Sequence, residues 1–224
     1  MSQLSLTPQT TSVLKNFSTI NGSIMIREGN VLKTISVGEN MIAQYTSPEM
    51  FPKTCGIYDL GQFLMGLSLF QDPGLNFEND EYVTIRGGRR SAKYYFSDPE
   101  ITLKSAPDRD VRFPGADMEF SLSSEDLVQL QKASGVYNLP DLSFVSTKDG
   151  VVTLNLCDKE NDTANAYTQE IKGTATGAYE LFLKVENLKL FPGDYNVKIS
   201  SQLITEWRHV TLDLVYYIAL EPSL

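Results

Sequence analysis

The side chains that could perform catalysis are few in this chain of 224 residues. His209 is the only histidine, so a histidine metal cluster and a mechanism with paired histidines are excluded. Its neighbours Trp207 and Arg208 favour a structural or surface histidine. The sequence also lacks the Gly-x-Ser-x-Gly turn around a nucleophilic serine and the Cys-x-x-Cys pair of redox enzymes. We therefore expect neither enzymatic activity nor a cofactor.

Two further patterns resemble ligand sites but lack essential residues. Asp158, Glu160 and Asp162 alternate like the first ligands of a calcium loop, yet the glycine and the bidentate glutamate of such a loop are missing. The segment 87–90, Gly-Gly-Arg-Arg, has neither the length nor the Lys-Ser/Thr of a phosphate-binding loop. We interpret the first as a solvated hairpin loop without a metal and the second as a hairpin turn. A basic fingertip that touches phosphate is the alternative for the second.

The elements that position these residues occur twice along the chain. Matches recur at a constant offset of 121 residues, among them Gly56 with Gly177 and residues 58–60 with 179–181. Composition bias would scatter such matches over many offsets. We therefore predict a duplicated domain of about 110 residues, long enough to bury its own core.

Each half is predicted to run in the order helix, strands, helix, strands. Thr7-Pro8 begins a first helix that ends at Asn21-Gly22, and a helical apolar spacing from Leu60 predicts a second. Ser123 to Asp126 resembles a capping box that opens a third helix, and apolar residues from Leu181 to Leu188 indicate a fourth. Strands are predicted around residues 23–27, 31–37, 41–45, 82–86, 92–97, 142–146, 151–157, 195–200, 203–207 and 210–220.

The composition is that of an acidic globular protein. A net charge of −9 argues against a simple nucleic-acid binder with a basic face, although it does not exclude a protein that holds DNA by shape. No apolar run approaches the length of a membrane span, and the N-terminus lacks a signal-peptide pattern, which predicts a cytosolic protein without a membrane partner. Cys55 and Cys157 are then expected to be free, buried thiols.

The predicted helices carry lysines on their outward sides. These are Lys15, Lys132, Lys184 and Lys189. Lys184 stands at the position that matches Phe63 in the first copy. The ordinary solvated face of an amphipathic helix explains any one of these lysines. The alternative hypothesis is that helices from both halves face one polyanion.

Four groups of residues resemble the DNA polymerase sliding clamp of T-even-type bacteriophages. They are residues 14–21 for its first helix, 57–60 with 67–69 for its second, 187–189 with 192–195 for the end of its fourth, and 216–221 for its last strand. Their order and spacing agree over nearly the whole chain. The resemblance implies an α+β DNA-clamp fold, with two similar domains that each pack two helices on antiparallel sheet. We place these domains at residues 1–106 and 117–224, with a connector at 107–116.

The resemblance further implies a non-enzymatic processivity factor. A homotrimeric ring would encircle duplex DNA without sequence preference and tether the phage replicative polymerase to it. An ATP-driven clamp loader would open the ring, in the cytoplasm of the infected bacterial host. By this resemblance Lys15, Lys132 and Lys189 face DNA, and the repeat adds Lys184.

Partner peptides of clamps bind near the connector and the C-terminal strand, which makes Phe113, Leu220 and Pro222 the candidates for partner contacts. The competing hypothesis is a structural, ring-forming phage protein of the tube or baseplate type. Such proteins also use duplicated β-rich domains, but they have no reason to concentrate lysine on helices.

Overall fold

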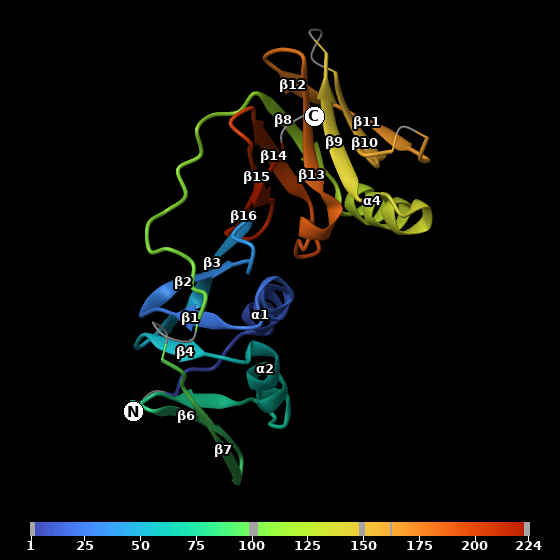
Figure 1. The fold of residues 1–224 in the computed structure, drawn as a ribbon. Coiled ribbons are helices and arrows are strands. Elements are labelled where there is room, and N and C mark those ends of the chain that lie inside the picture. Colours follow the sequence, from blue (N-terminus) through green and yellow to red (C-terminus); the bar gives the residue numbers. More distant parts are fainter. Residues whose placement is uncertain (1–2, 99–102, 148–150, 162, 222–224) are drawn as a thin grey trace. The chain divides into compact units, whose positions relative to one another are not determined.

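The structure is a computed structural model that describes residues 3–98, 103–147, 151–161 and 163–221. The chain divides into two compact units, Met1–Arg109 and Asp110–Leu224 (Figure 1). This division falls between the predicted end of the first domain and the predicted start of the second. Each unit has its own helical and sheet layers, so each is described by itself.

Unit 1 has two helices, α1 (Pro8–Ile20) and α2 (Leu60–Ser68), which contact each other. Both start where the sequence predicts, because the side chains of Thr7 and Asp59 accept a hydrogen bond from the backbone N–H three residues further on. The predicted apolar stripes are buried in the core of the unit, at Val13, Leu14, Phe17, Ile20, Leu60, Phe63, Leu64 and Leu67.

The strands of unit 1 lie on one side of these helices (Figure 1). They are β1 (Ile24–Ile26), β2 (Gly29–Ile35), β3 (Met41–Phe51), β4 (Cys55–Ile57), β5 (Gly74–Asn76), β6 (Tyr82–Gly87) and β7 (Arg90–Tyr95). All described pairs within the unit are antiparallel: β1 with β4, β2 with β3, and β6 with both β5 and β7. Helix α1 packs against β2 and β3, which closes the core.

Unit 2 contains one α-helix among its described residues, α4 (Ser124–Tyr137), which packs against β10. Its strands are β8 (Met118–Leu122), β9 (Asp141–Ser146), β10 (Val152–Cys157), β11 (Tyr167–Ile171), β12 (Gly173–Ala175), β13 (Tyr179–Lys184), β14 (Tyr195–Ser200), β15 (Ile204–His209) and β16 (Leu214–Ala219). One sheet has the order β11-β10-β9-β13, and the other contains β12-β8-β14-β15-β16. Phe144 of the first sheet meets Trp207 of the second edge to face in the core, with ring centroids 6.3 Å apart.

The predicted fourth helix is wrong. Residues 179–184 form strand β13, antiparallel to β9, and only the short 3₁₀ turn η1 (Val185–Asn187) follows. Leu181 and Leu188 are buried as expected, so the sequence identified the apolar positions but not their period. Tyr179, Leu181 and Leu183 also alternate as in a strand, and the ladder that β9 offers decides between the two.

The two units resemble each other in part of their element order, but their spacing is not constant. Helix α4 starts 116 residues after α1, whereas β15 starts 122 residues after β6 and β16 starts 124 residues after β7. The match of residues 58–60 with 179–181 therefore pairs the start of α2 with β13, which are different elements. The fixed offset of 121 residues therefore does not pair equivalent elements throughout. The predicted order of helix, strands, helix and strands holds in unit 1, whereas unit 2 has β13 and η1 in place of the second α-helix.

Candidate nucleic-acid interface

In each unit taken by itself, the helices present a surface of low charge on an acidic protein. Lys15 is the only charged residue of α1, and α2 has none. Helix α4 carries Lys132 together with Glu125 and Asp126 in its first turn. The remaining exposed positions are mostly serine, threonine, glutamine or small apolar residues. No helix in the described part of the chain is long and apolar enough to cross a membrane. A polyanion that passes such a surface meets little repulsion and only weak attraction.

Two predicted helix lysines do project outward. Lys15 is exposed on α1, and Lys132 is exposed on α4, between the exposed Val128 and Val136 one turn away on either side. Lys189 is also exposed but follows η1 rather than ending an α-helix. That these three lysines contact DNA remains a prediction.

Lys184 is not an outward helix lysine. It is the last residue of β13, and its Nζ lies 2.8 Å from Oδ1 of Asp141 and 3.8 Å from Oε2 of Glu221. Asp141 is fully buried, so its carboxylate depends on this partner. The hydrogen bond to Asp141 raises the pKa of Lys184 above its ordinary value. The positive charge of Lys184 is thus neutralised by acidic side chains of the same unit.

Asp141, Lys159, Lys184 and Glu221 together form a charge cluster in unit 2. Lys159 pairs with Glu221 through its side chain, and its backbone N–H donates to Oδ2 of Asp141 at 3.1 Å. The backbone N–H of Glu221 also donates to the carbonyl of Phe182 in β13 at 2.7 Å. The charge cluster therefore fastens the end of the described chain to the edge of the sheet.

The three predicted partner-binding residues have different environments. Leu220 is only 6% exposed, so its side chain belongs to the core. Phe113 is half-buried, and Pro222 lies outside the described residues. Phe113 is therefore the one candidate of the three that the described structure offers to a partner.

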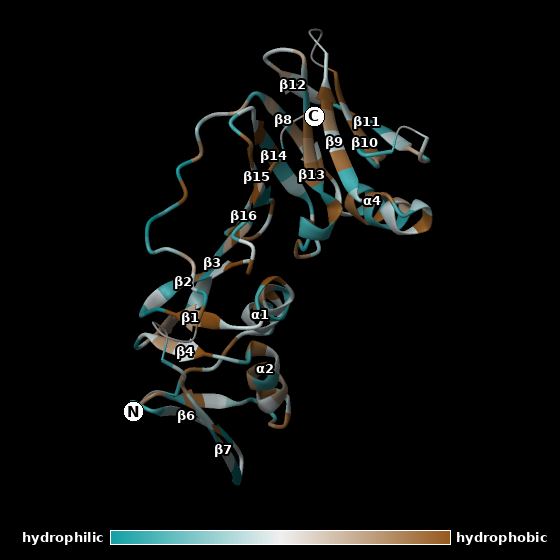
Figure 2. Ribbon diagram, in the orientation of Figure 1, coloured by the Kyte–Doolittle hydropathy of each residue, from teal (hydrophilic) through white to brown (hydrophobic). Residues whose placement is uncertain are grey.

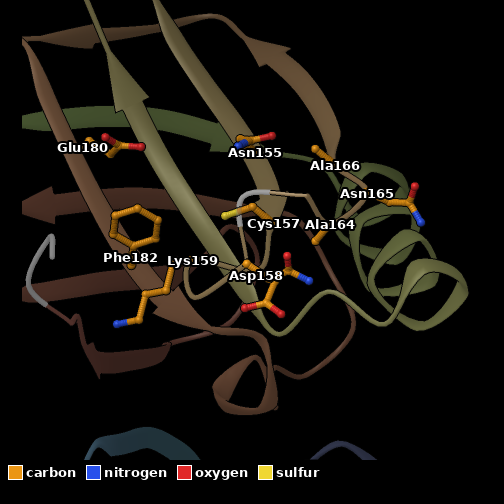
Figure 3. Close-up of a pocket in the computed structure, with 10 residues that line it drawn as sticks. Asn155, Cys157, Asp158, Lys159, Ala164, Asn165, Ala166, Glu180 and Phe182 are labelled. Atoms are coloured by element: carbon orange, nitrogen blue, oxygen red, sulfur yellow. The ribbon is translucent and has the colours of Figure 1, made fainter.

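A pocket of about 370 Å³ opens on the outward face of β10 and β13, beside the charge cluster (Figure 3). Cys157 and Asn155 of β10 and Glu180 and Phe182 of β13 line it. Burial raises the pKa of the Cys157 thiol, which keeps it protonated and poorly nucleophilic. Among the described residues, no group of His, Cys, Asp and Glu side chains is arranged to hold a metal ion.

The remaining chemical candidates are structural. His209 is buried, and its Nδ1 accepts hydrogen bonds from the backbone N–H groups of Thr211 and Leu212, both at 3.2 Å. Of the two environments predicted from the sequence, structural or surface, His209 occupies the structural one. Both cysteines are free, and burial raises the pKa of Cys55 to about 12. Cys157 is half-buried, whereas a buried thiol was predicted.

Further exposed positive charges lie outside the helices, on the hairpin formed by β6 and β7. Arg86, Arg89, Arg90 and Lys93 are all exposed on the β6–β7 hairpin, whose turn includes Gly88 at a φ of 57°. These are four of the 19 lysines and arginines in the chain. The pair of arginines after two glycines was visible in the sequence, but the side of the sheet that each one faces was not.

Comparison with solved structures defines the class of protein. Proliferating cellular nuclear antigen from Entamoeba histolytica matches with a TM-score of 0.69 over 95% of this chain and 94% of that chain, at 15% identity. The A. fulgidus protein of the same name, solved with the C-terminal region of FEN-1, matches with a TM-score of 0.70 over 99% and 98% of the two chains, at 11% identity. The fold is that of a DNA clamp.

Sequence comparison then identifies the family. The family model for the DNA polymerase processivity factor matches residues 7–98. The sliding clamp of Vibrio phage KVP40 is 30% identical over 224 residues, covering 97% of this chain and 99% of the relative. The sliding clamp of Enterobacteria phage T4 is 28% identical over 87% of this chain and 86% of its own. This chain belongs to the sliding-clamp family of T4-like phages, as its resemblance indicated, and the tube or baseplate alternative is not favoured.

Proposed function

We propose that this protein assembles as a homotrimeric ring that encircles duplex DNA and tethers the phage replicative polymerase for processive synthesis. The observation that carries the proposal is the end-to-end match to the KVP40 sliding clamp. The role is mechanical rather than catalytic, and the ring acts in the infected bacterial cell. Since the sequence has no phosphate-binding loop, an ATP-driven loader opens the ring from outside.

Two strand edges support assembly from identical copies. In unit 1, β7 ends the sheet β5-β6-β7, and in unit 2, β11 ends the sheet β11-β10-β9-β13. An edge strand presents unpaired N–H and C=O groups that can pair with another chain. At the opposite edge of the unit 2 sheet, β13 already pairs with Glu221. Joining β7 of one copy to β11 of the next is a head-to-tail contact, which gives a closed ring when the rotation closes.

The low charge of the helices supports sliding. A closed ring stays on DNA by topology, so it requires little affinity, and tight phosphate contacts would slow its movement. Lys15, Lys132 and Lys189 supply weak attraction that is independent of sequence. We do not include Lys184, whose charge pairs with Asp141. Phe113 remains our candidate for contact with a partner peptide.

The decisive test is retention on nicked circular DNA after loading, followed by linearisation. We expect the protein to remain on the circle through gel filtration and to leave when the circle is cut. Light scattering should give three times the chain mass of 25.0 kDa. Protein that stays bound after the cut, or a hexamer or filament in solution, would contradict the trimeric sliding ring.

A further inference from the structure

The hairpin formed by β6 and β7 carries positive charge that is not part of the helices or of their proposed contact with DNA. Arg86, Arg89 and Arg90 are all exposed. None of the three forms an ion pair with an acidic side chain in the described part of the chain, whereas Arg27 pairs with Asp108. Figure 2 shows β7 as largely hydrophilic. Unpaired guanidinium groups on a protein with a net charge of −9 are available to an anionic partner.

Strand alternation places these arginines on different faces of the sheet. The ring of Tyr94 in β7 packs edge to face on Phe63 of α2, with centroids 5.2 Å apart. Arg90 stands four residues before Tyr94 on the same strand, so it faces the helix side. Arg86 pairs with Ser91 in the ladder, so it faces the opposite side. The two arginines of one hairpin thus point away from each other.

The hairpin passes close to the carboxyl end of α2. Gly87 is the ladder partner of Arg90. A Cβ on Gly87 would come within 2.9 Å of the Cβ of Phe70 and 3.1 Å of the carbonyl oxygen of Gln71, which follow α2. In Figure 1 the hairpin projects past this end of the helix. Arg90 therefore adds a positive charge on the side of the sheet that faces the helices, which we call the helix-side surface. This charge lies near the carboxyl end of α2, a helix that has no cation of its own.

We propose that Arg90 is a DNA-backbone contact that extends the helix-side surface beyond α2, with Arg89 at the turn adding to the attraction. Arg86, on the far side of the sheet, has no such role. The inference rests on the proposed function and adds a subsite to it. The planar guanidinium binds a phosphate through two N–H groups, which positions the duplex without selecting a sequence. Pairing of the β7 backbone with another copy leaves the Arg90 side chain on the helix side.

The matched variants are Arg90→Gln and Arg86→Gln, which remove the same charge from opposite faces of one hairpin. Binding to a short fluorescent duplex is measured by anisotropy over a series of salt concentrations, without the loader. We expect Arg90→Gln to bind more weakly at low salt. The slope of log affinity against log salt should be shallower by about one unit for each phosphate that the variant no longer binds. Arg86→Gln should match the wild type, and two duplexes of different sequence should give the same result.

Two outcomes would overturn the inference. One is an equal salt slope for the two glutamine variants. The other is a salt slope for Arg90→Lys that is as shallow as the slope for Arg90→Gln, although lysine keeps the charge, while light scattering gives an intact trimer for both variants. Failure of the wild-type protein to remain on circular DNA would instead contradict the proposed ring itself. The two failures are therefore distinguishable.

Discussion

At the scale of single residues, Lys184 shows how an internal partner changes the meaning of a charge. Its sequence context suggested an outward helix cation, but its ammonium lies against Asp141, whose carboxylate is fully buried. A buried charge that loses its partner costs several kcal/mol, because the remaining ion keeps its desolvation penalty. The charge cluster therefore stabilises unit 2 and the attachment of Glu221.

We predict that Lys184→Met lowers the free energy of unfolding by about 3 kcal/mol. Urea unfolding should be followed by the fluorescence of Trp207, the only tryptophan, which is buried in unit 2. Lys132→Met, which removes an exposed lysine from α4, is the control and should change stability by at most about 0.5 kcal/mol. Adding Asp141→Asn to Lys184→Met should restore part of the loss. Equal stability of the two single variants would show that the ion pair contributes nothing.

At the scale of elements, helix α1 is anchored by a carboxylate that is distant in sequence. Glu49 of β3 is buried and accepts hydrogen bonds from the backbone N–H of Thr7, the hydroxyl of Thr10 at 2.6 Å and the hydroxyl of Ser47. Burial by itself raises the pKa of Glu49, but these hydrogen bonds outweigh it and hold the pKa below its ordinary value of 4.5. The negative charge also lies at the amino end of α1, where the helix dipole favours it.

This lowered pKa predicts a pH-dependent stability for unit 1. The unfolded chain binds a proton at Glu49 more readily than the folded chain, so the contribution of the carboxylate is complete above pH 4.5 and is lost as the pH falls through the folded pKa. We expect Glu49→Gln to cost about 2 kcal/mol at neutral pH, since hydrogen bonds to a charged group are lost. The difference from the wild type should shrink below pH 4.5.

The measurement is urea unfolding by far-ultraviolet circular dichroism across this pH range, because Trp207 reports on unit 2 only. Glu28→Gln, which changes an exposed glutamate of unit 1, is the matched control. A Glu49→Gln difference that stays constant from neutral to acidic pH would show that the charge of Glu49 is not what anchors α1.

At the scale of the whole molecule, the proposed ring separates residence on DNA from affinity for DNA. Binding through phosphate contacts weakens steeply as the salt concentration rises. The reason is that added salt reduces the free energy gained when the protein releases counterions from the DNA. A topological link has no such dependence. We therefore predict that moderate salt shortens the lifetime of the loaded ring on closed circular DNA far less than it weakens binding to linear duplex. Both are measured with the same labelled protein, and a parallel loss in the two assays would contradict a closed ring.

Much of the fold follows from the sequence alone, because its signals are local. The caps at Thr7, Asp59 and Ser123 lie within one turn of the N–H groups that they satisfy, so α1, α2 and α4 were predictable. The alternation and turn residues of the hairpins are equally local. The structural histidine and the poor catalytic inventory needed only the amino-acid composition and order.

The tertiary structure decided whatever depends on a distant partner. The segment 179–184 is a strand because β9 supplies its ladder, and Lys184 is internal because Asp141 lies opposite it in that ladder, 43 residues earlier in the chain. In the same way, the packing of Tyr94 on α2 determines which side Arg90 faces. Lysines and arginines with different roles look alike in a sequence. Local patterns place a residue on a helix or strand, but they do not show which distant residues its side chain contacts. Long-range pairing therefore decides which of them remain available to DNA.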